Sequence, residues 1–185
     1  VKENPKKDGS TYDIYRDGLR IYTTIDSRMQ EYAEEAVEMH LSNLQKEFFI
    51  QSKGNKNAPF VQLTNEETKK IINRAMRNSE RWRQMSSQGK TEEDIIKSFD
   101  IKTKMSVFTW KGEKDTLMTP KDSIVYYKHF LQTGMMSMEP VTGNVKAWVG
   151  GIDYKHFQYD HVAQGARQVG STFKPFVYAT AIDQL

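Results

Sequence analysis

The spacing of hydrophobic and polar positions changes several times along the chain, and each change marks an expected structural element. Residues 1–18 combine proline, glycine and charged residues without periodicity, so they are predicted to form an irregular linker. Residues 19–24 alternate and are rich in β-branched and aromatic side chains, which favours a strand. Residues 27–49 follow the N-capping residue Asp26 with apolar side chains at three- and four-residue spacings, which predicts a helix. The apolar face of this helix is expected to contain Met29, Ala33, Ala36, Val37, His40, Leu41 and Leu44.

The next part of the chain is predicted to be mainly helical. After a break rich in glycine and asparagine, Thr64 begins a capping pattern with an acidic residue three positions later, which opens a helix to about Ser87. Thr91 begins the same pattern for a shorter third helix. Pro120 suits the first turn of a further helix, which is expected to continue over residues 122–132.

Two antiparallel hairpins are also expected. Residues 104–110 and 115–118 flank the polar sequence Lys-Gly-Glu-Lys, and residues 133–138 and 144–149 flank a Pro-Val-Thr-Gly turn. A pair of glycines at positions 150–151 is expected to end the last strand.

Composition narrows the class of protein without pointing to a function. A hydrophobic fraction of 37% in 185 residues and a mean hydropathy of −0.73 predict one domain with many exposed helices. The net charge of +3 gives no electrostatic case for nucleic acid, and the lack of cysteine excludes disulfides and thiolate chemistry. The apolar stretch Phe176–Ile182 is too short to span a membrane, so any anchor is expected outside this chain.

The stretch Gln168–Phe176 is the strongest candidate for chemistry. Ser171 follows a glycine and Lys174 lies three positions later, which on a helix places both side chains on one face. The Lys174 amine could then accept the Ser171 hydroxyl proton, near a helix N-terminus that stabilises a developing oxyanion. Pro175 fits only if the helix begins near Ser171, because an interior proline would clash. On its own this spacing also suits a capping serine beside a surface lysine.

Other candidate sites are weaker. Gly165–Gly170 has the glycine spacing of a phosphate-binding loop, but Ser171 occupies the position where that loop needs lysine. His156 and His161 have no metal-ligand spacing and no third ligand, so they are interpreted as solvated loop residues. No cofactor and no metal are therefore expected.

Two further groups of residues are interpreted as structural. Trp110 and Trp148 fall in predicted strands, where core packing is favoured over stacking against a glycan. A row of arginines on the second predicted helix is interpreted as a solvated or ion-paired face rather than an anion site: Arg74, Arg77 and Arg81.

The sequence around Ser171 resembles a known family. The runs Met138–Tyr154 and Gln164–Tyr178, and the upstream segment Leu19–Asp26, are similar to the transpeptidase domain of class A penicillin-binding proteins. The resemblance implies that Ser171 is the nucleophile, acylated by a D-Ala-D-Ala stem peptide or by a β-lactam, and that Lys174 is its general base. The family usually has proline at the position before the glycine, where this chain has valine, which loosens that turn.

The resemblance also implies an organisation. It indicates a linker at 1–18, then a first strand, helical subdomain and hairpin insertion at 19–132, and the N-terminal part of the transpeptidase core at 133–185. The implied fold is α+β, an incomplete transpeptidase sheet with its active-site helix. The family's serine-x-asparagine and lysine-threonine-glycine elements are expected beyond Leu185. Without them, four apolar side chains of the helix are not all expected to be buried: Phe173, Phe176, Val177 and Tyr178.

The implied function is a peptidoglycan D,D-transpeptidase on the periplasmic side of the bacterial cytoplasmic membrane, in a protein that also carries a glycosyltransferase and a membrane anchor. Its expected partners are stem peptides and β-lactams, with other cell-wall synthesis proteins as candidates. Two alternatives remain. A serine β-lactamase or D,D-carboxypeptidase shares the S-x-x-K spacing, and a non-catalytic interaction module would suit residues 48–132, which are interpreted as a spacer or docking surface.

Overall fold

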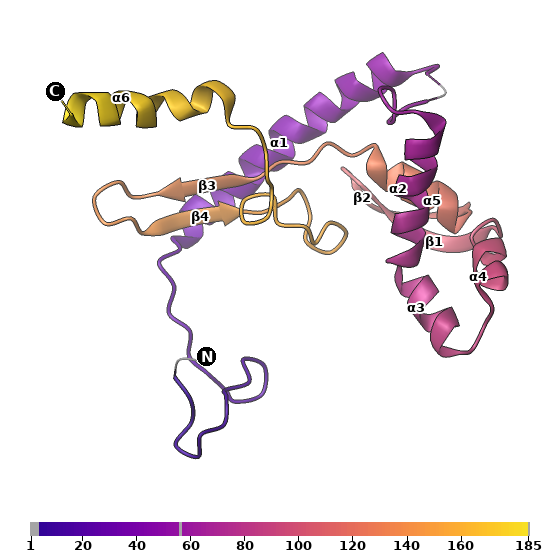
Figure 1. Ribbon diagram of the computed structural model, residues 1–185, viewed down its shortest axis with the longest axis horizontal. Coiled ribbons are helices and arrows are strands. Elements are labelled where there is room, and N and C mark those ends of the chain that lie inside the picture. Colours follow the sequence, from indigo (N-terminus) through magenta and orange to yellow (C-terminus); the bar gives the residue numbers. More distant parts are fainter. Residues whose placement is uncertain (1–3, 56, 185) are drawn as a thin grey trace.

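The computed structural model describes residues 4–55 and 57–184 and combines helices with two small antiparallel sheets (Figure 1). The α+β class predicted from the sequence is confirmed. The helices are α1 (Ser27–Ser52), α2 (Asn65–Arg77), α3 (Glu80–Ser87), α4 (Glu92–Ser98), α5 (Pro120–Lys128), the 3₁₀-helix η1 (Gly170–Phe173) and α6 (Lys174–Asp183), and the strands are β1 (Thr103–Thr109), β2 (Gly112–Met118), β3 (Met135–Met138) and β4 (Val145–Val149).

Helix α1 begins at the predicted residue and covers one face of the sheet β3–β4 (Figure 1). The Asp26 side chain accepts hydrogen bonds from the backbone N–H groups at the start of the helix. Ala33 and Val37 pack against Ala147 and Val149 of β4. The buried stripe is narrower than predicted, because only residues at four-residue spacing are buried: Ala33, Val37, Leu41 and Gln45. Four residues predicted for the apolar face are exposed: Met29, Ala36, His40 and Leu44.

The strand predicted for residues 19–24 does not form. The Thr24 hydroxyl donates to the carbonyl of Val145 at 2.7 Å, and the Asp26 N–H donates to the carbonyl of Lys146 at 2.9 Å. The segment therefore meets β4 only at its end, and no ladder of backbone hydrogen bonds follows, so alternation alone did not produce a strand.

Residues 65–98 form three helices where the sequence predicted two. Thr64 and Glu67 form the predicted capping box of α2, and Thr91 caps α4 as expected. The helix predicted to extend to Ser87 instead ends at Arg77. Ser79 explains the break, because its hydroxyl donates to the Met76 carbonyl at 2.6 Å and accepts from the N–H of the third residue of α3.

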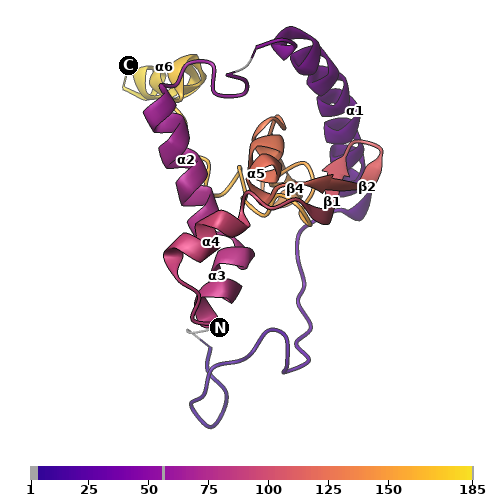
Figure 2. The same ribbon diagram turned by 90° about the vertical axis from the view of Figure 1, so that its right-hand side faces the viewer.

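A hydrophobic cluster holds these helices together. Met76 from α2 and Ile95 from α4 are buried with Phe99, and Trp82 and Ile124 pack against the cluster. Figure 2 shows α1 and the helices α2 to α4 on opposite sides, with α5 between them. The cluster is therefore separate from the one between α1 and β4.

Both predicted hairpins form, but the first has a shorter connection than predicted, because Gly112, Glu113 and Lys114 belong to β2. β1 pairs with β2 so that Thr109 lies opposite Gly112, and β3 pairs with β4 with an irregularity after Ser137. Thr119 caps α5, whose proline stands at the first turn as predicted, although the helix ends at Lys128 rather than near residue 132. The two hairpins and α5 supply the framework from which the C-terminal segment departs.

One buried amide joins α1 to the end of α5. Gln45 is only 1% exposed. Its Nε2 donates to the carbonyl of His129 at 2.9 Å, and its Oε1 accepts from the N–H of Leu131 at 2.8 Å. Both polar ends of the side chain are satisfied, which is the condition under which burying an amide is tolerated.

The C-terminal helix projects away from the remainder of the chain (Figure 1). The side chains of Phe173, Phe176, Val177 and Tyr178 are 52%, 66%, 53% and 64% exposed, as predicted from the sequence. None of the helices that the structure describes has both the length and the apolar content needed to cross a bilayer.

Candidate active site

Ser171 and Lys174 lie at the junction of η1 and α6. The Lys174 backbone N–H donates to the Ser171 carbonyl, which closes one 3₁₀ turn between them. Side chains three residues apart in a 3₁₀-helix eclipse one another, so the hydroxyl and the amine emerge on the same side. The prediction that the helix begins near Ser171 is confirmed, and Pro175 occupies the first turn of α6. The catalytic roles of the two side chains stay predictions.

The turn before Ser171 is fixed by its neighbours. Gly170 has a φ of +52°, in the left-handed region that glycine adopts without strain. Val169, where the family usually has proline, has a φ of −67°, which is the value that a proline ring enforces. The Thr172 hydroxyl and N–H both donate to the Val169 carbonyl. The turn therefore keeps a proline-compatible geometry despite the valine.

The side chains of Ser171 and Lys174 are both exposed. Residues 166–184 are exposed along their whole length. Within the part of the chain that the structure describes, no hydrogen bond joins Ser171 Oγ to Lys174 Nζ. The described residues thus place the two predicted site residues at a helix start, and no other described side chain encloses them.

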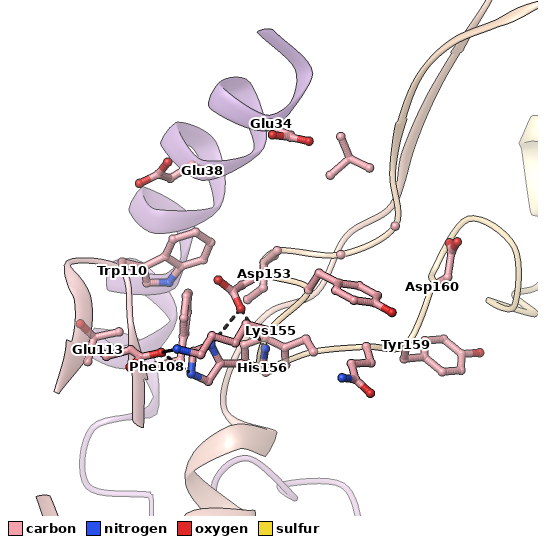
Figure 3. A pocket seen from close by; sticks show the side chains of 18 of the residues that line it. Glu34, Glu38, Phe108, Trp110, Glu113, Asp153, Lys155, His156, Tyr159 and Asp160 are labelled. Atoms are coloured by element: carbon pink, nitrogen blue, oxygen red, sulfur yellow. Dashed lines mark hydrogen bonds and ion pairs between the residues drawn. The ribbon is translucent and has the colours of Figure 1, made fainter. Parts of the chain in front are cut away.

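A cavity of about 780 Å³ lies next to the loop that leads to Ser171 (Figure 3). Its walls come from three parts of the chain: Glu34 and Glu38 of α1, the tip of the hairpin β1–β2, and residues 148–160. Trp110 and Trp148 both line it. Trp110 packs edge-on against Phe108 with ring centroids 5.6 Å apart. Trp110, which lies just beyond the end of β1, therefore combines packing with a position on the cavity wall, whereas the Trp148 indole donates a hydrogen bond to Asp160.

His156 lies between two carboxylates at the floor of this cavity (Figure 3). Its Nδ1 is 2.8 Å from Asp153 Oδ1, and its Nε2 is 3.3 Å from Glu113 Oε1. The side chain is only 13% exposed, and its ring stacks on Tyr127. The interpretation of His156 as a solvated loop residue is therefore wrong, because contacts with a distant hairpin cover it. The ring of His161, by contrast, contacts only that of Tyr159 among the aromatic rings described.

Glu113 also pairs with Lys155, and the pairing moves the pKa values of both side chains. The hydrogen bond from Lys155 lowers the pKa of Glu113 below its ordinary value, and the same bond raises the pKa of Lys155. No local pattern predicts this contact, because the two residues are 42 positions apart. Only the spacing of Asp153 and His156 could have suggested the other half of the network.

The predicted row of arginines does not form on one helix. Arg74 and Arg77 belong to α2, whereas Arg81 belongs to α3 beyond the Ser79 break. Arg77 pairs with Glu92 and lies over the ring of Trp82, 5.0 Å from its centroid. The interpretation of Arg77 as part of an intramolecular ion-pair face is confirmed.

Comparison with known proteins gives a consistent result. A family model described as the penicillin-binding protein middle domain matches residues 55–131. Penicillin-binding protein 1A from Rickettsia bellii is 30% identical over 194 residues, covering 95% of this chain and 24% of the relative. The proteins of the same name from Neisseria flavescens and Aquifex aeolicus are each 26% identical, covering 92% and 91% of this chain and 24% and 23% of the relatives. No solved structure matches.

The chain belongs to the penicillin-binding protein family. Within that family it is similar to the 1A proteins along most of its length, so the class A assignment made from the sequence is confirmed. The chain spans about a quarter of the length of the curated relatives it matches. The family model covers α2 to α5, which contain none of the predicted catalytic residues.

Proposed function

We propose that the full-length protein to which this chain belongs is a peptidoglycan D,D-transpeptidase that uses Ser171 as nucleophile and Lys174 as general base. One observation carries the proposal. Ser171 and Lys174 are one 3₁₀ turn apart at the start of α6, in a chain similar to penicillin-binding proteins 1A over more than nine-tenths of its length.

The acylation step follows from the two side chains. Ser171 Oγ attacks the carbonyl carbon between the two terminal D-alanines of a stem peptide, and its proton passes to the neutral Lys174 amine. The negative charge that forms on the carbonyl oxygen is stabilised by the positive end of the helix that begins here. When the peptide bond breaks, the nitrogen of the departing D-alanine takes a proton from Lys174, and an ester remains on Ser171.

Transfer of the acyl group reverses these roles. An amine on a neighbouring stem peptide attacks the ester carbonyl, loses a proton to Lys174, and forms the cross-linking peptide bond. Ser171 Oγ leaves and regains its proton. A β-lactam follows the first half of this route, because its strained amide acylates Ser171 and its ring-opened product stays attached.

The proposal extends to the domains, ligands and location of the full-length protein. Residues 133–184 would be the start of an α+β transpeptidase core, with stem peptides and β-lactams as ligands. A glycosyltransferase, a membrane anchor and a position in the bacterial cell envelope would come with segments outside this chain. The helices α2 to α5 would be the middle domain and a candidate surface for other cell-wall synthesis proteins.

A labelling experiment tests the proposal. The full-length protein is incubated with fluorescent penicillin and resolved by denaturing electrophoresis, and Ser171→Ala is compared with Ser87→Ala, which removes an exposed serine hydroxyl from α3. We expect no covalent label on the first variant and labelling on the second. Persistent label distinguishes a transpeptidase from a serine β-lactamase, which would release hydrolysed penicillin within the same period. Normal labelling of Ser171→Ala would sink the assignment.

A further inference from the structure

The loop between β4 and Ser171 folds back onto the end of the hairpin β3–β4, and Asp160 makes the central contacts. Its Oδ2 accepts from Trp148 Nε1 at 2.9 Å. Its Oδ1 accepts from the N–H groups of Val162 and Ala163 at 2.9 and 3.0 Å. One carboxylate therefore both attaches the loop to β4 and closes the loop's own turn.

Three glycines make room for this attachment. A β-carbon on Gly150 would lie 2.8 Å from Asp160 Cγ, and the Gly150 carbonyl accepts from the His161 N–H at 2.7 Å. A β-carbon on Gly165 would lie 2.4 Å from the His161 carbonyl oxygen, and one on Gly134 would meet Val162 at 2.9 Å. The backbones of these three glycines are not in the left-handed region, so it is close approach that requires them.

The strand to which Asp160 attaches is itself held by α1. The N–H of Trp148 donates to Gln30 Oε1 at 2.8 Å, and Gln30 Nε2 donates to the Trp148 carbonyl at 3.0 Å. A continuous set of hydrogen bonds thus runs from α1 through Trp148 to Asp160. The attachment point is part of the packed framework rather than a second loop.

We propose that Asp160 is a positioning residue for Ser171. It fixes the loop as far as Gly165, and only residues 166–170 separate that point from the nucleophile. The six residue-to-residue steps from Gly165 to Ser171 reach at most about 22 Å, so the position of Gly165 sets the region that Ser171 can occupy. This inference rests on the proposed function, because it concerns the placement of the acylated serine.

The charge of Asp160 agrees with this role. The hydrogen bond from the Ala163 N–H, together with those from Trp148 and Val162, lowers the pKa of the carboxyl below its ordinary value. The side chain is therefore an ionised acceptor at neutral pH, the state in which it makes all three hydrogen bonds.

The test measures acylation of the full-length protein by a chromogenic β-lactam, separating the acylation rate constant from the dissociation constant of the noncovalent complex. Asp160→Ala removes three hydrogen bonds. Asp160→Asn keeps the oxygen that accepts from Val162 and Ala163, and Trp148→Phe removes only the indole donor. Asp153→Ala is the matched control, because Asp153 accepts two hydrogen bonds from His156 in the same loop and its described side-chain hydrogen bonds do not reach β4.

We expect Asp160→Ala to lower the acylation rate constant at least tenfold, with the dissociation constant within about threefold of normal, since misplacing a reacting group slows the chemical step. Asp160→Asn and Trp148→Phe should each lower the acylation rate constant by about threefold to fivefold, and Asp153→Ala should leave it within about twofold of normal. Equal losses for Asp153→Ala and Asp160→Ala would mean that loop order alone matters and would overturn the inference.

The milder variants keep the test decisive if Asp160→Ala does not fold. In that case, Trp148→Phe should accelerate the hydrogen exchange of the Val162 and Ala163 amides in the 185-residue chain. The same substitution should lower the acylation rate constant of the full-length protein. An unchanged rate constant in Asp160→Ala or in both milder variants would also overturn the inference. Failure of the proposed function itself has a different signature, namely normal labelling of Ser171→Ala.

Discussion

The side-chain amide of Gln30 forms two hydrogen bonds with the backbone of Trp148, in the way that a neighbouring strand would. The Asp26 N–H also donates to the Lys146 carbonyl. Together, Gln30 and Asp26 therefore provide hydrogen-bond partners for backbone groups of alternate residues along the outer edge of β4. Unpaired strand edges favour association with other chains. The first turn of α1 therefore both starts the helix and closes the edge of a sheet of two strands.

Replacing Gln30 tests this closure. Gln30→Leu keeps the size of the side chain but leaves the N–H and carbonyl of Trp148 without partners, so we expect a loss of about 1–3 kcal/mol in the free energy of unfolding. Denaturant titration of the chain measures it. Glu31→Leu, an exposed neighbour on the same helix, is the control, and an equal loss in both variants would contradict the edge-closing role.

Asp26 gives α1 a predictable response to acid. The hydrogen bond from the Met29 N–H, and the one from Arg28, lower the pKa of the Asp26 carboxyl below its ordinary value of 3.8. Because the folded value lies below the unfolded one, the stabilisation by this cap is present above about pH 4 and is lost as the pH falls through the lowered value. NMR titration of the Asp26 carboxyl should give the lowered pKa, and Asp26→Asn should remove this contribution. A midpoint at or above 3.8 would contradict the assignment.

Arg77 should matter for stability and not for acylation. Its pair with Glu92 is more than half exposed, so reversing the charge in Arg77→Glu is expected to cost about 1 kcal/mol, including the contact with Trp82. The exchanged pair Arg77→Glu with Glu92→Arg should recover part of this loss. Acylation of the full-length protein by a soluble β-lactam should stay within a few-fold of normal in Arg74→Glu/Arg77→Glu, and a large drop would reveal a role in catalysis.

Lys174 should determine how fast Ser171 is acylated, although the acyl group itself is attached to Ser171. Lys174→Ala is expected to slow penicillin labelling by at least about 10²-fold, the usual effect of a positioned general base. Lys174→Arg should not restore the rate, because a guanidinium cannot accept the serine proton. Arg167→Ala, which removes another cation before Ser171, is the control. Labelling of Lys174→Ala at the normal rate would refute the role of general base.

The isolated chain of 185 residues should react poorly with penicillin although it contains Ser171 and Lys174. The described residues form no wall to hold a β-lactam carboxylate, and losing oxyanion donors alone typically costs about 10²–10³ in rate. Purified chain is mixed with excess penicillin and followed by intact mass over time. Rapid, stoichiometric acylation would show that the two side chains suffice.

Local signals predicted local structure well. The caps at Asp26, Thr64 and Thr91 are decided by a side chain and an amide two or three residues away, and all three are confirmed. The helix start near Ser171 and Lys174 could be predicted for the same reason, because it depends only on neighbouring residues. The break at Ser79 was not predicted, because the capping pattern at Thr64 marks where a helix begins and not where it ends. Residues 19–24 form no strand, because they have no partner strand.

Contacts between distant segments could not be predicted in this way. Gln45 looked like an ordinary polar residue on a helix, yet its two partners lie 84 and 86 positions away. Asp160 likewise gains its position from an indole on another strand and from the space left by Gly150. The roles of Gln45 and Asp160 depend on which backbone N–H and carbonyl groups lack a partner after the elements have packed. A single sequence does not show which groups these are.

The two hydrophobic clusters share no buried residue: Met76, Ile95 and Phe99 form one, and α1 forms the other with β4. A substitution that enlarges or shrinks a side chain in one cluster therefore leaves the packing of the other unchanged. The side chains of α2 to α4 can therefore change in volume and shape during evolution while the packing of α1 against β4 stays the same. Divergence in the middle of the chain need not be matched by divergence at its end.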